Sequence, residues 1–222
     1  MSRRFNTILE NRYNLHPKHR QSLKDLIYEA AENYSKILPI RIDFHLSSSV
    51  GLEVDRQDFV DYWHAMQNNM RRNQRFEHLI TYIAKLEYGY NRGWHMHMLL
   101  LFDGQKIKDD YSLSSDIGEY WNQVVESKKL HEGSYYACNM AKKRYDQCAL
   151  KMISSSYALN QIKNNTNAYT DLHALIDTTE YLTKIDQNTE NYLAEQGLKR
   201  KPRTIFFGQI KLKSNAGRPR LF

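Results

Sequence analysis

The chain has 222 residues, of which 41% are hydrophobic and 12% aromatic, and its formal net charge is +7. This length suits one compact domain or at most two small ones, and the apolar fraction excludes a wholly disordered chain. No segment approaches the roughly 20 apolar residues of a membrane span, and the charged N-terminal region does not resemble a secretory signal. Two cysteines, Cys138 and Cys148, are too few for a disulfide framework. We therefore expect a soluble, cytoplasmic protein.

The basic excess is concentrated at the C-terminal end. Residues 198–222 contain eight of the 32 Lys and Arg residues and no acidic residue, which leaves 24 basic and 25 acidic side chains in residues 1–197. A cationic segment favours a polyanion, because each phosphate contact releases counterions. A solubilising tail is the alternative. The candidate DNA contacts in this segment are Lys199, Arg200, Lys201, Arg203, Arg218 and Arg220.

Hydrophobic periodicity predicts the first two elements of the fold. Residues 16–38 have apolar residues at helical spacing, and Pro39 is expected to end this helix. Residues 40–47 then alternate strictly, which predicts a half-buried strand. The apolar face of this strand consists of Ile40, Ile42, Phe44 and Leu46, and the polar face of Arg41, Asp43, His45 and Ser47.

The rest of the chain continues this mixture of helices and strands. Helices are expected over 55–75, 110–127 and 170–193, and strands over 78–88, 94–102, 134–137, 149–153 and 204–212. The turn at residues 89–93 joins two of these strands in a hairpin. The order predicts an α+β fold with a central antiparallel sheet flanked by helices, in a single domain with a basic C-terminal tail.

The expected hairpin carries a candidate metal site. His95 and His97 project from the same face of the strand 94–102, about 7 Å apart, because side chains alternate along a strand. Glu87 has the parity that places its carboxylate on this face in any even-sum register of the hairpin. Two imidazoles and one carboxylate form an incomplete shell that suits a catalytic Mg²⁺ or Mn²⁺. Packing with hydrogen bonding is the alternative for such a histidine pair.

Tyr181 and Lys184 form a second signal, in the expected helix 170–193. With about 100° per residue, Tyr181 lies about 180° from Leu172 of the apolar stripe, and Lys184 about 60° from Tyr181. Both residues are therefore expected on a face that does not pack into the core. The alternative is an ordinary surface pair of tyrosine and lysine.

These segments together resemble those of a known superfamily. The motifs are Leu86-Glu-Tyr-Gly89, Gly93-Trp-His-Met-His97, Glu180-Tyr-Leu-Thr-Lys-Ile-Asp186 and, near the end, Arg203-Thr, Phe207-Gly208 and Gly217-Arg-Pro-Arg220. The chain resembles the HUH (His-hydrophobe-His) endonucleases, and among them the replication initiators of filamentous phages and their prophage and phage-satellite relatives. The likeness extends from about residue 38 to the end and is sharp only at the motifs. It implies a palm-like or RRM-like sheet in a domain over residues 1–197, with the catalytic core at about 38–195.

The resemblance implies a rolling-circle replication initiator that nicks and rejoins single-stranded DNA at a specific origin. The cation on His95, His97 and Glu87 would polarise the scissile phosphodiester. Tyr181 would attack phosphorus, which leaves a 5′-phosphotyrosine and a free 3′-hydroxyl, and Lys184 would lower the tyrosine's pKa or neutralise the transition-state charge. Ile185 stands where some members carry a second tyrosine, so one catalytic tyrosine is expected.

The implied partners are single-stranded or hairpin origin DNA, with a helicase and a polymerase of the bacterial host. A host helicase is needed because the chain has no phosphate-binding Gly-x-x-x-x-Gly-Lys-Ser/Thr motif. Arg92 and Trp94 could clamp a single-stranded base, although a core position is equally open for Trp94. Asp43 and His45 could face the DNA or the metal, but a salt bridge to Arg41 is favoured. Two competing functions are a non-catalytic nucleic-acid-binding protein and a phosphodiesterase that uses water as its nucleophile.

Overall fold

The computed structural model describes residues 14–47, 52–128, 131–141, 151–197 and 202–212. Across these ranges six strands form one antiparallel sheet in the order β4-β1-β3-β2-β6, with β5 paired to β1. The α+β fold with a central antiparallel sheet and flanking helices is confirmed. The strands are β1 (Lys36–Leu46), β2 (Leu79–Gly89), β3 (Gly93–Asp103), β4 (Gly133–Ala137), β5 (Ile153–Ser154) and β6 (Ile205–Phe207). The α-helices are α2 (Pro17–Asn33), α3 (Arg56–Asn69), α4 (Asp110–Glu126), α5 (Ser155–Asn164), α6 (Asp171–Thr179) and α7 (Gln187–Glu195).

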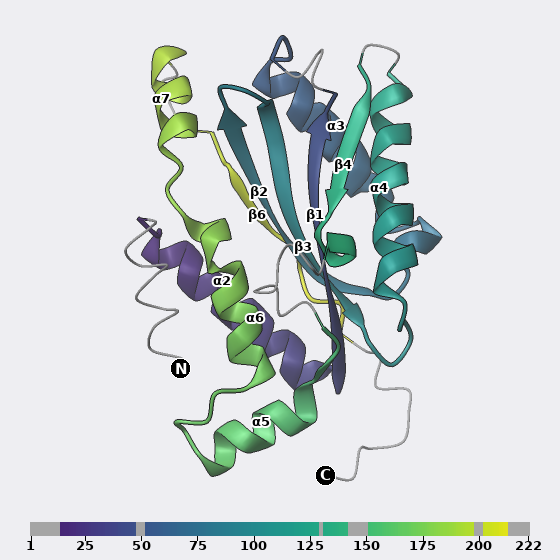
Figure 1. Cartoon of the computed structure of the whole chain (residues 1–222), viewed down its shortest axis with the longest axis vertical. Coiled ribbons are helices and arrows are strands. Elements are labelled where there is room, and N and C mark those ends of the chain that lie inside the picture. The colour runs from purple at the N-terminus through teal and green to yellow at the C-terminus, as the bar shows by residue number, and fades with distance from the viewer. Residues whose placement is uncertain (1–13, 48–51, 129–130, 142–150, 198–201, 213–222) are drawn as a thin grey trace.

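Helices cover both faces of the sheet. The apolar face of β1 packs with β3 and with α3 and α4, and Ile40, Ile42 and Phe44 have no exposed surface, as the strict alternation predicts. The opposite face packs against α2, α5 and α6, through residues that include Leu99 and Leu101 of β3. Figure 1 shows these three helices around the lower part of the sheet and α7 beside its upper end. In the described part of the chain, no helix combines the length and apolar character that a membrane crossing requires.

The first helix ends earlier than the sequence predicts, and Pro39 lies inside β1. Helix α2 ends at Asn33, and β1 begins at Lys36. The carbonyl of Pro39 accepts a hydrogen bond from Asn139 Nδ2, and the Arg41 N–H donates to Asn139 Oδ1. Pro39 lies between the part of β1 that pairs with β5 and the part that pairs with β4. The missing N–H of the proline therefore costs the sheet no ladder hydrogen bond.

The predicted hairpin is confirmed, with Glu87 directly opposite His95 and Gly89 opposite Gly93. Gly93 has φ 68°, a left-handed conformation that glycine adopts without steric cost. Met96 and Met98 are fully buried on the face of α3 and α4, so the histidines of β3 point to the other face. That face carries Leu99 and Leu101 further along β3. The histidines therefore lie where the apolar core of this face gives way to polar side chains.

The predicted helix over 170–193 is wrong. The chain there forms α6, a 3₁₀-helix η3 (Glu180–Thr183), an extended residue Lys184 and then α7. The N-terminal segment causes this break: His16 N–H donates to Thr183 O at 2.8 Å, and Ile185 N–H donates to Asn14 O at 2.7 Å. These contacts replace the hydrogen bonds of a continuous helix. Asp186 then caps the start of α7 by accepting from the Thr189 N–H.

Four other elements differ from the sequence prediction. The helix expected over 55–75 ends at Asn69, and α5 was not predicted. Of the strand expected over 149–153, β5 contains only Ile153, and residues 149–150 lie outside the described ranges. The strand expected over 204–212 is present as the shorter β6, which pairs with β2 within the segment also expected to be a basic tail. That part of the C-terminal segment therefore belongs to the folded domain.

Candidate functional site

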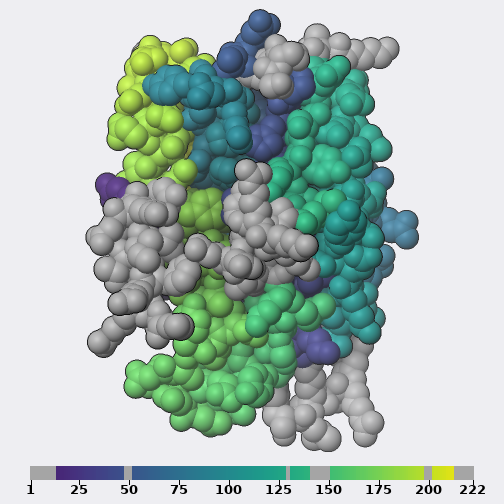
Figure 2. Space-filling model, viewed as in Figure 1, coloured from purple at the N-terminus to yellow at the C-terminus, as the bar shows by residue number. Residues whose placement is uncertain are grey.

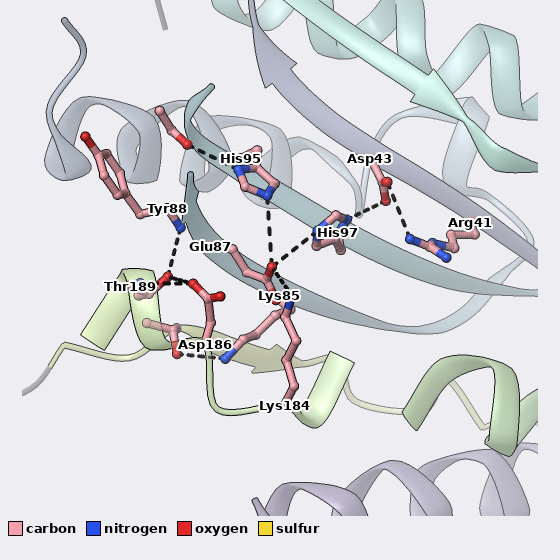
Figure 3. Close-up of polar contacts among 12 residues, drawn as sticks. Arg41, Asp43, Lys85, Glu87, Tyr88, His95, His97, Lys184, Asp186 and Thr189 are labelled. Atoms are coloured by element: carbon pink, nitrogen blue, oxygen red, sulfur yellow. Dashed lines mark hydrogen bonds and ion pairs between the residues drawn. The ribbon is translucent and has the colours of Figure 1, made fainter. Parts of the chain in front are cut away.

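Glu87, His95 and His97 lie together on the polar end of the β2–β3 hairpin. Glu87 Oε2 is 4.0 Å from His95 Nε2 and 3.5 Å from His97 Nε2. One ligand atom from each of the three residues lies within 4.8 Å of the others. Figure 3 shows both imidazoles directed at this carboxylate. The structure thus brings together the three residues that the sequence predicts as metal ligands.

The other nitrogen of each imidazole is already engaged. His97 Nδ1 lies 2.7 Å from Asp43 Oδ1, and His95 Nδ1 lies 3.2 Å from the carbonyl oxygen of Gly93. Carboxylates and carbonyls at this second nitrogen orient metal-binding histidines and leave Nε2 for the cation. Glu87 Oε1 is buried and has no hydrogen-bond partner among the described residues. Two nitrogens and one carboxylate, whose second oxygen has no partner among the described residues, fit a divalent cation with open coordination positions.

The charges of the site are strongly coupled. Burial acts to lower the pKa of His97, but Asp43 and Glu87 outweigh it and raise this pKa to about 9. Burial acts to raise the pKa of Glu87, but His97 and Lys184 lower it to about 2. The pKa of Asp43 is also about 2, because contact with His97 and Arg41 outweighs burial. Without a metal, a protonated His97 thus lies between two carboxylates.

Tyr181 lies beside the histidines. Its ring meets the His97 ring edge-on with 5.8 Å between centroids, and the Arg41 guanidinium carbon lies 4.3 Å from the Tyr181 centroid. The Tyr181 hydroxyl is enclosed and has no hydrogen-bond partner within the described ranges. Burial raises the pKa of Tyr181 well above 10, and Arg41 opposes this shift. The arrangement comes from η3 and not from the helical face that the sequence predicts.

Two lysines lie on the side of the cluster that is opposite Tyr181 and Arg41. Lys184 Nζ lies 2.9 Å from Glu87 Oε2, so the predicted Lys184 does reach the candidate metal site. Lys85 is 5% exposed, and its Nζ donates to Thr204 Oγ1 at 3.4 Å. Burial lowers the pKa of Lys85, and Glu87 and Asp186 act against this. The sequence analysis missed Lys85, although it shares the parity of Glu87 in β2.

The polar face of β1 contributes more than the sequence analysis predicts. The expected pair between Arg41 and Asp43 is present, at 3.4 Å between Arg41 Nη2 and Asp43 Oδ2. Asp43 also orients His97, and the His45 ring stacks on His95 with centroids 5.6 Å apart. Burial and the neighbouring His95 lower the pKa of His45 to about 4. The strict alternation of β1 predicts which of its residues share a polar face. Only the pairing of Asp43 with His97 in the structure shows that this face belongs to the candidate metal site.

The segment that carries Tyr181 is anchored by a buried ion pair. Glu180 is 1% exposed, and its Oε1 lies 2.7 Å from Arg20 Nε and 3.3 Å from Lys24 Nζ, both on α2. A buried carboxylate requires such partners. These contacts hold η3 against α2 and thereby fix the position of Tyr181.

The predicted DNA contacts have mixed positions. Arg92 is exposed in the hairpin turn, whereas Trp94 is fully buried and packs against Tyr88 and Tyr192, so the core alternative holds for Trp94. Arg203 donates from Nε to the Ile205 carbonyl. The space-filling view shows the tip of the β2–β3 hairpin between α7 on one side and β4 with α4 on the other (Figure 2). The predicted contacts Lys199, Arg200, Lys201, Arg218 and Arg220 lie outside the described residues.

The fold and the site define an α+β protein whose sheet presents two histidines and a glutamate beside a tyrosine and a lysine. The family model described as the YagK/YfjJ C-terminal domain matches residues 2–192, and the chain belongs to this family. No curated protein and no solved structure matches the chain.

Proposed function

We propose that this protein is a metal-dependent endonuclease that cuts one DNA strand and stays joined to the new 5′ end through Tyr181. The observation that carries the proposal is the contact of Tyr181 with His97 at the edge of the candidate metal-binding cluster. Tyr181 is 84 or more residues from each candidate metal ligand in the sequence, and its buried hydroxyl has no hydrogen-bond partner among the described residues. A purely structural cluster would not need such a tyrosine beside it. The arrangement also supports the resemblance to HUH endonucleases and to their palm-like or RRM-like sheet.

The proposed reaction exchanges one phosphodiester for another. A bond forms between the Tyr181 oxygen and phosphorus, and the bond from phosphorus to the 3′ oxygen breaks with its electron pair leaving on that oxygen. The phenol loses one proton and the 3′ oxygen gains one, so no oxidant or nucleotide is consumed. Because the bond energy is conserved, the 3′-hydroxyl can attack the phosphotyrosine and rejoin the strand.

Each residue of the site has a distinct role in the proposed reaction. Glu87, His95 and His97 would hold Mg²⁺ or Mn²⁺, which supplies Lewis-acid stabilisation of charge on the phosphate oxygens. Arg41 orients the Tyr181 ring and favours its phenolate by proximity. Lys184 and Lys85 bring positive charge to the side of the cluster opposite Arg41, where the leaving oxygen develops negative charge. Asp43 fixes the orientation of His97.

The biological role that we propose is initiation of rolling-circle replication of a phage-like mobile element in the cytoplasm of a bacterial cell. Single-stranded or hairpin origin DNA is the proposed substrate, and the basic C-terminal segment adds affinity for its phosphates. The free 3′-hydroxyl would serve a host polymerase, and a host helicase would separate the strands.

Covalent capture of DNA tests the proposal. A randomised single-stranded DNA library is incubated with the full chain and Mn²⁺, and adducts are detected on a denaturing gel as bands that protease removes. We expect adducts with the wild-type protein and none with Tyr181→Phe, while DNA affinity changes less than twofold. Tyr192→Phe is the matched control, because this tyrosine packs against Tyr88 beside the same hairpin but away from His97, and it should still form adducts.

Each other outcome identifies a different function. An adduct that persists in Tyr181→Phe would show that another residue is the nucleophile. Cleavage without any adduct would favour the phosphodiesterase that uses water. Salt-sensitive binding without cleavage, lost when Lys199, Arg200, Lys201, Arg218 and Arg220 are replaced together by glutamine so that β6 is kept, would favour the non-catalytic nucleic-acid-binding protein.

A further inference from the structure

A cavity of about 490 Å³ lies next to the candidate metal site, between the start of α2, the start of α7 and β6. Its lining includes His16, His19, Ser22, Arg203, Thr204 and Phe207. This volume lies within the range of about 300 to 1,000 Å³ of pockets that bind small organic ligands. The residues proposed for metal binding and for attack on phosphorus do not line it, so the reaction itself leaves the cavity without a role.

Aromatic rings from the start of α2 and from β6 line one side of the cavity. The rings of His16 and His19 stack with centroids 3.9 Å apart and an interplanar angle of 18°, and the Phe207 centroid lies 6.5 Å from that of His19. Burial and the neighbouring His16, Lys85 and Arg203 lower the pKa of His19 to about 4, so this ring is neutral at pH 7. Aromatic rings beside an arginine form the kind of surface on which nucleic-acid bases stack.

The sheet register sets the distance from this cavity to the metal site. Asp43 pairs with His97, His97 with Lys85, and Lys85 with Ile205, which lines the cavity. Neighbouring strands are about 4.8 Å apart, so His97 and Ile205 are separated by about 10 Å across the sheet. Lys85 bridges the two places through its contact with Thr204. One nucleotide held at the metal site can therefore extend its base into the cavity.

The position of Tyr181 indicates whether the base in the cavity belongs to the nucleotide on the 5′ or on the 3′ side of the cut. Tyr181 lies on the β1 side of His97, next to Arg41, whereas Lys184, Lys85 and the cavity lie on the β2 and β6 side. Figure 3 shows Arg41 and the two lysines on opposite sides of His97. In an in-line displacement the leaving oxygen is opposite the attacking oxygen. The leaving 3′ oxygen and its nucleoside are then on the side of the cavity.

We propose that the cavity binds the base of the nucleotide that carries the leaving 3′ oxygen, with His16, His19 and Phe207 as its stacking surface. This assignment rests on the proposed function for its polarity. It makes the base just 5′ of the cut a determinant of where the enzyme nicks, and it assigns a role to the N-terminal part of α2, which lies outside the motifs shared with HUH endonucleases.

A binding experiment tests the cavity without requiring any cleavage. The full chain is titrated with each of the four 2′-deoxynucleoside 3′-monophosphates and with inorganic phosphate, while the imidazole signals of His16 and His19 are followed by NMR. We expect at least one nucleotide to shift both signals saturably, and phosphate alone to leave them in place. His19→Ala should weaken the binding at least tenfold, and His64→Ala, an exposed histidine on α3, should not change it. Absence of any shift with all four nucleotides, or an equal shift with phosphate, would overturn the proposal.

A second measurement tests the polarity. The released fragments that end in the new 3′-hydroxyl are sequenced at their 3′ ends for the wild-type protein and for His19→Ala. We expect a base preference at the adjacent position that His19→Ala reduces at least fivefold while preferences at other positions persist. An unchanged preference in His19→Ala would overturn the assignment to the leaving nucleotide. If the wild-type protein formed no adducts, the proposed function would fail, and the NMR titration would still decide whether the cavity binds a base.

Discussion

Replacing Glu87 with Gln removes the negative charge that contacts His95, His97 and Lys184 in the candidate metal site. Glu87 is 3% exposed, and its Oε2 contacts Lys184 Nζ at 2.9 Å and His97 Nε2 at 3.5 Å. Its pKa is lowered from 4.5 to about 2, because these partners outweigh the effect of burial. A difference of this size between the folded and unfolded chain corresponds to about 3 kcal/mol of stability.

The sign of the pH dependence follows from the direction of this shift. A carboxylate whose pKa is lower in the folded chain stabilises the protein above its unfolded pKa, and this stabilisation is lost as the pH falls through the folded pKa. We expect metal-free Glu87→Gln to be less stable than the wild-type protein by about 3 kcal/mol at pH 7 and by roughly 1.5 kcal/mol near pH 3. Urea unfolding in the presence of a chelator measures both differences. Glu77→Gln, at an exposed carboxylate beside His78, is the matched control and should change stability by less than about 0.5 kcal/mol.

The same variant tests metal binding. Mn²⁺ at about 100 times its dissociation constant should stabilise the wild-type protein by about 2.7 kcal/mol, and Glu87→Gln should lose most of this gain. His64→Ala controls for binding to a surface histidine. Equal stability of Glu87→Gln and wild type at pH 7 would refute the buried charge network. An equal response to Mn²⁺ would refute the assignment of Glu87 as a ligand.

Substitutions at three further residues test the surroundings of the cluster. Lys184→Gln should slow adduct formation about 100-fold in single-turnover assays, because charge on the leaving oxygen loses a nearby cation, and a rate within threefold of wild type would exclude this role. Arg41→Ala should slow the same step at least tenfold and Arg41→Lys by less, since lysine retains the charge but not the planar contact with Tyr181. Glu180→Gln should cost about 3 kcal/mol of stability in urea unfolding, because it removes the buried carboxylate that pairs with Arg20 and Lys24, and an unchanged midpoint would mean that this ion pair does not anchor η3.

Part of the candidate site follows from strand periodicity alone. His95 and His97 share a face because side chains alternate along β3, and the short turn brings Glu87 into register with them. These relations involve residues within about ten positions of one another. Local sequence was therefore sufficient to predict the hairpin and its three candidate ligands.

The placement of Tyr181 was predicted for an incorrect reason. Helical spacing put Tyr181 and Lys184 on one face of a long helix, but the chain breaks there into η3 and an extended residue. Backbone contacts from residues 14 and 16 and the ion pair of Glu180 with α2 cause the break. No local pattern reports such contacts, because the partners are more than 150 residues apart in the sequence.

The amino-acid sequence by itself determined the elements whose patterns are local: the alternating strands, the hairpin, and the two histidines and glutamate that share its polar face. Only the tertiary structure decided what surrounds them. Arg41 and Asp43 join the site through the pairing of β1 with β3, Lys85 through its contact beside β6, and the cavity through the meeting of α2, α7 and β6. The physical reason is that strand pairing and packing between distant segments depend on the whole core, whereas periodicity depends only on neighbouring residues.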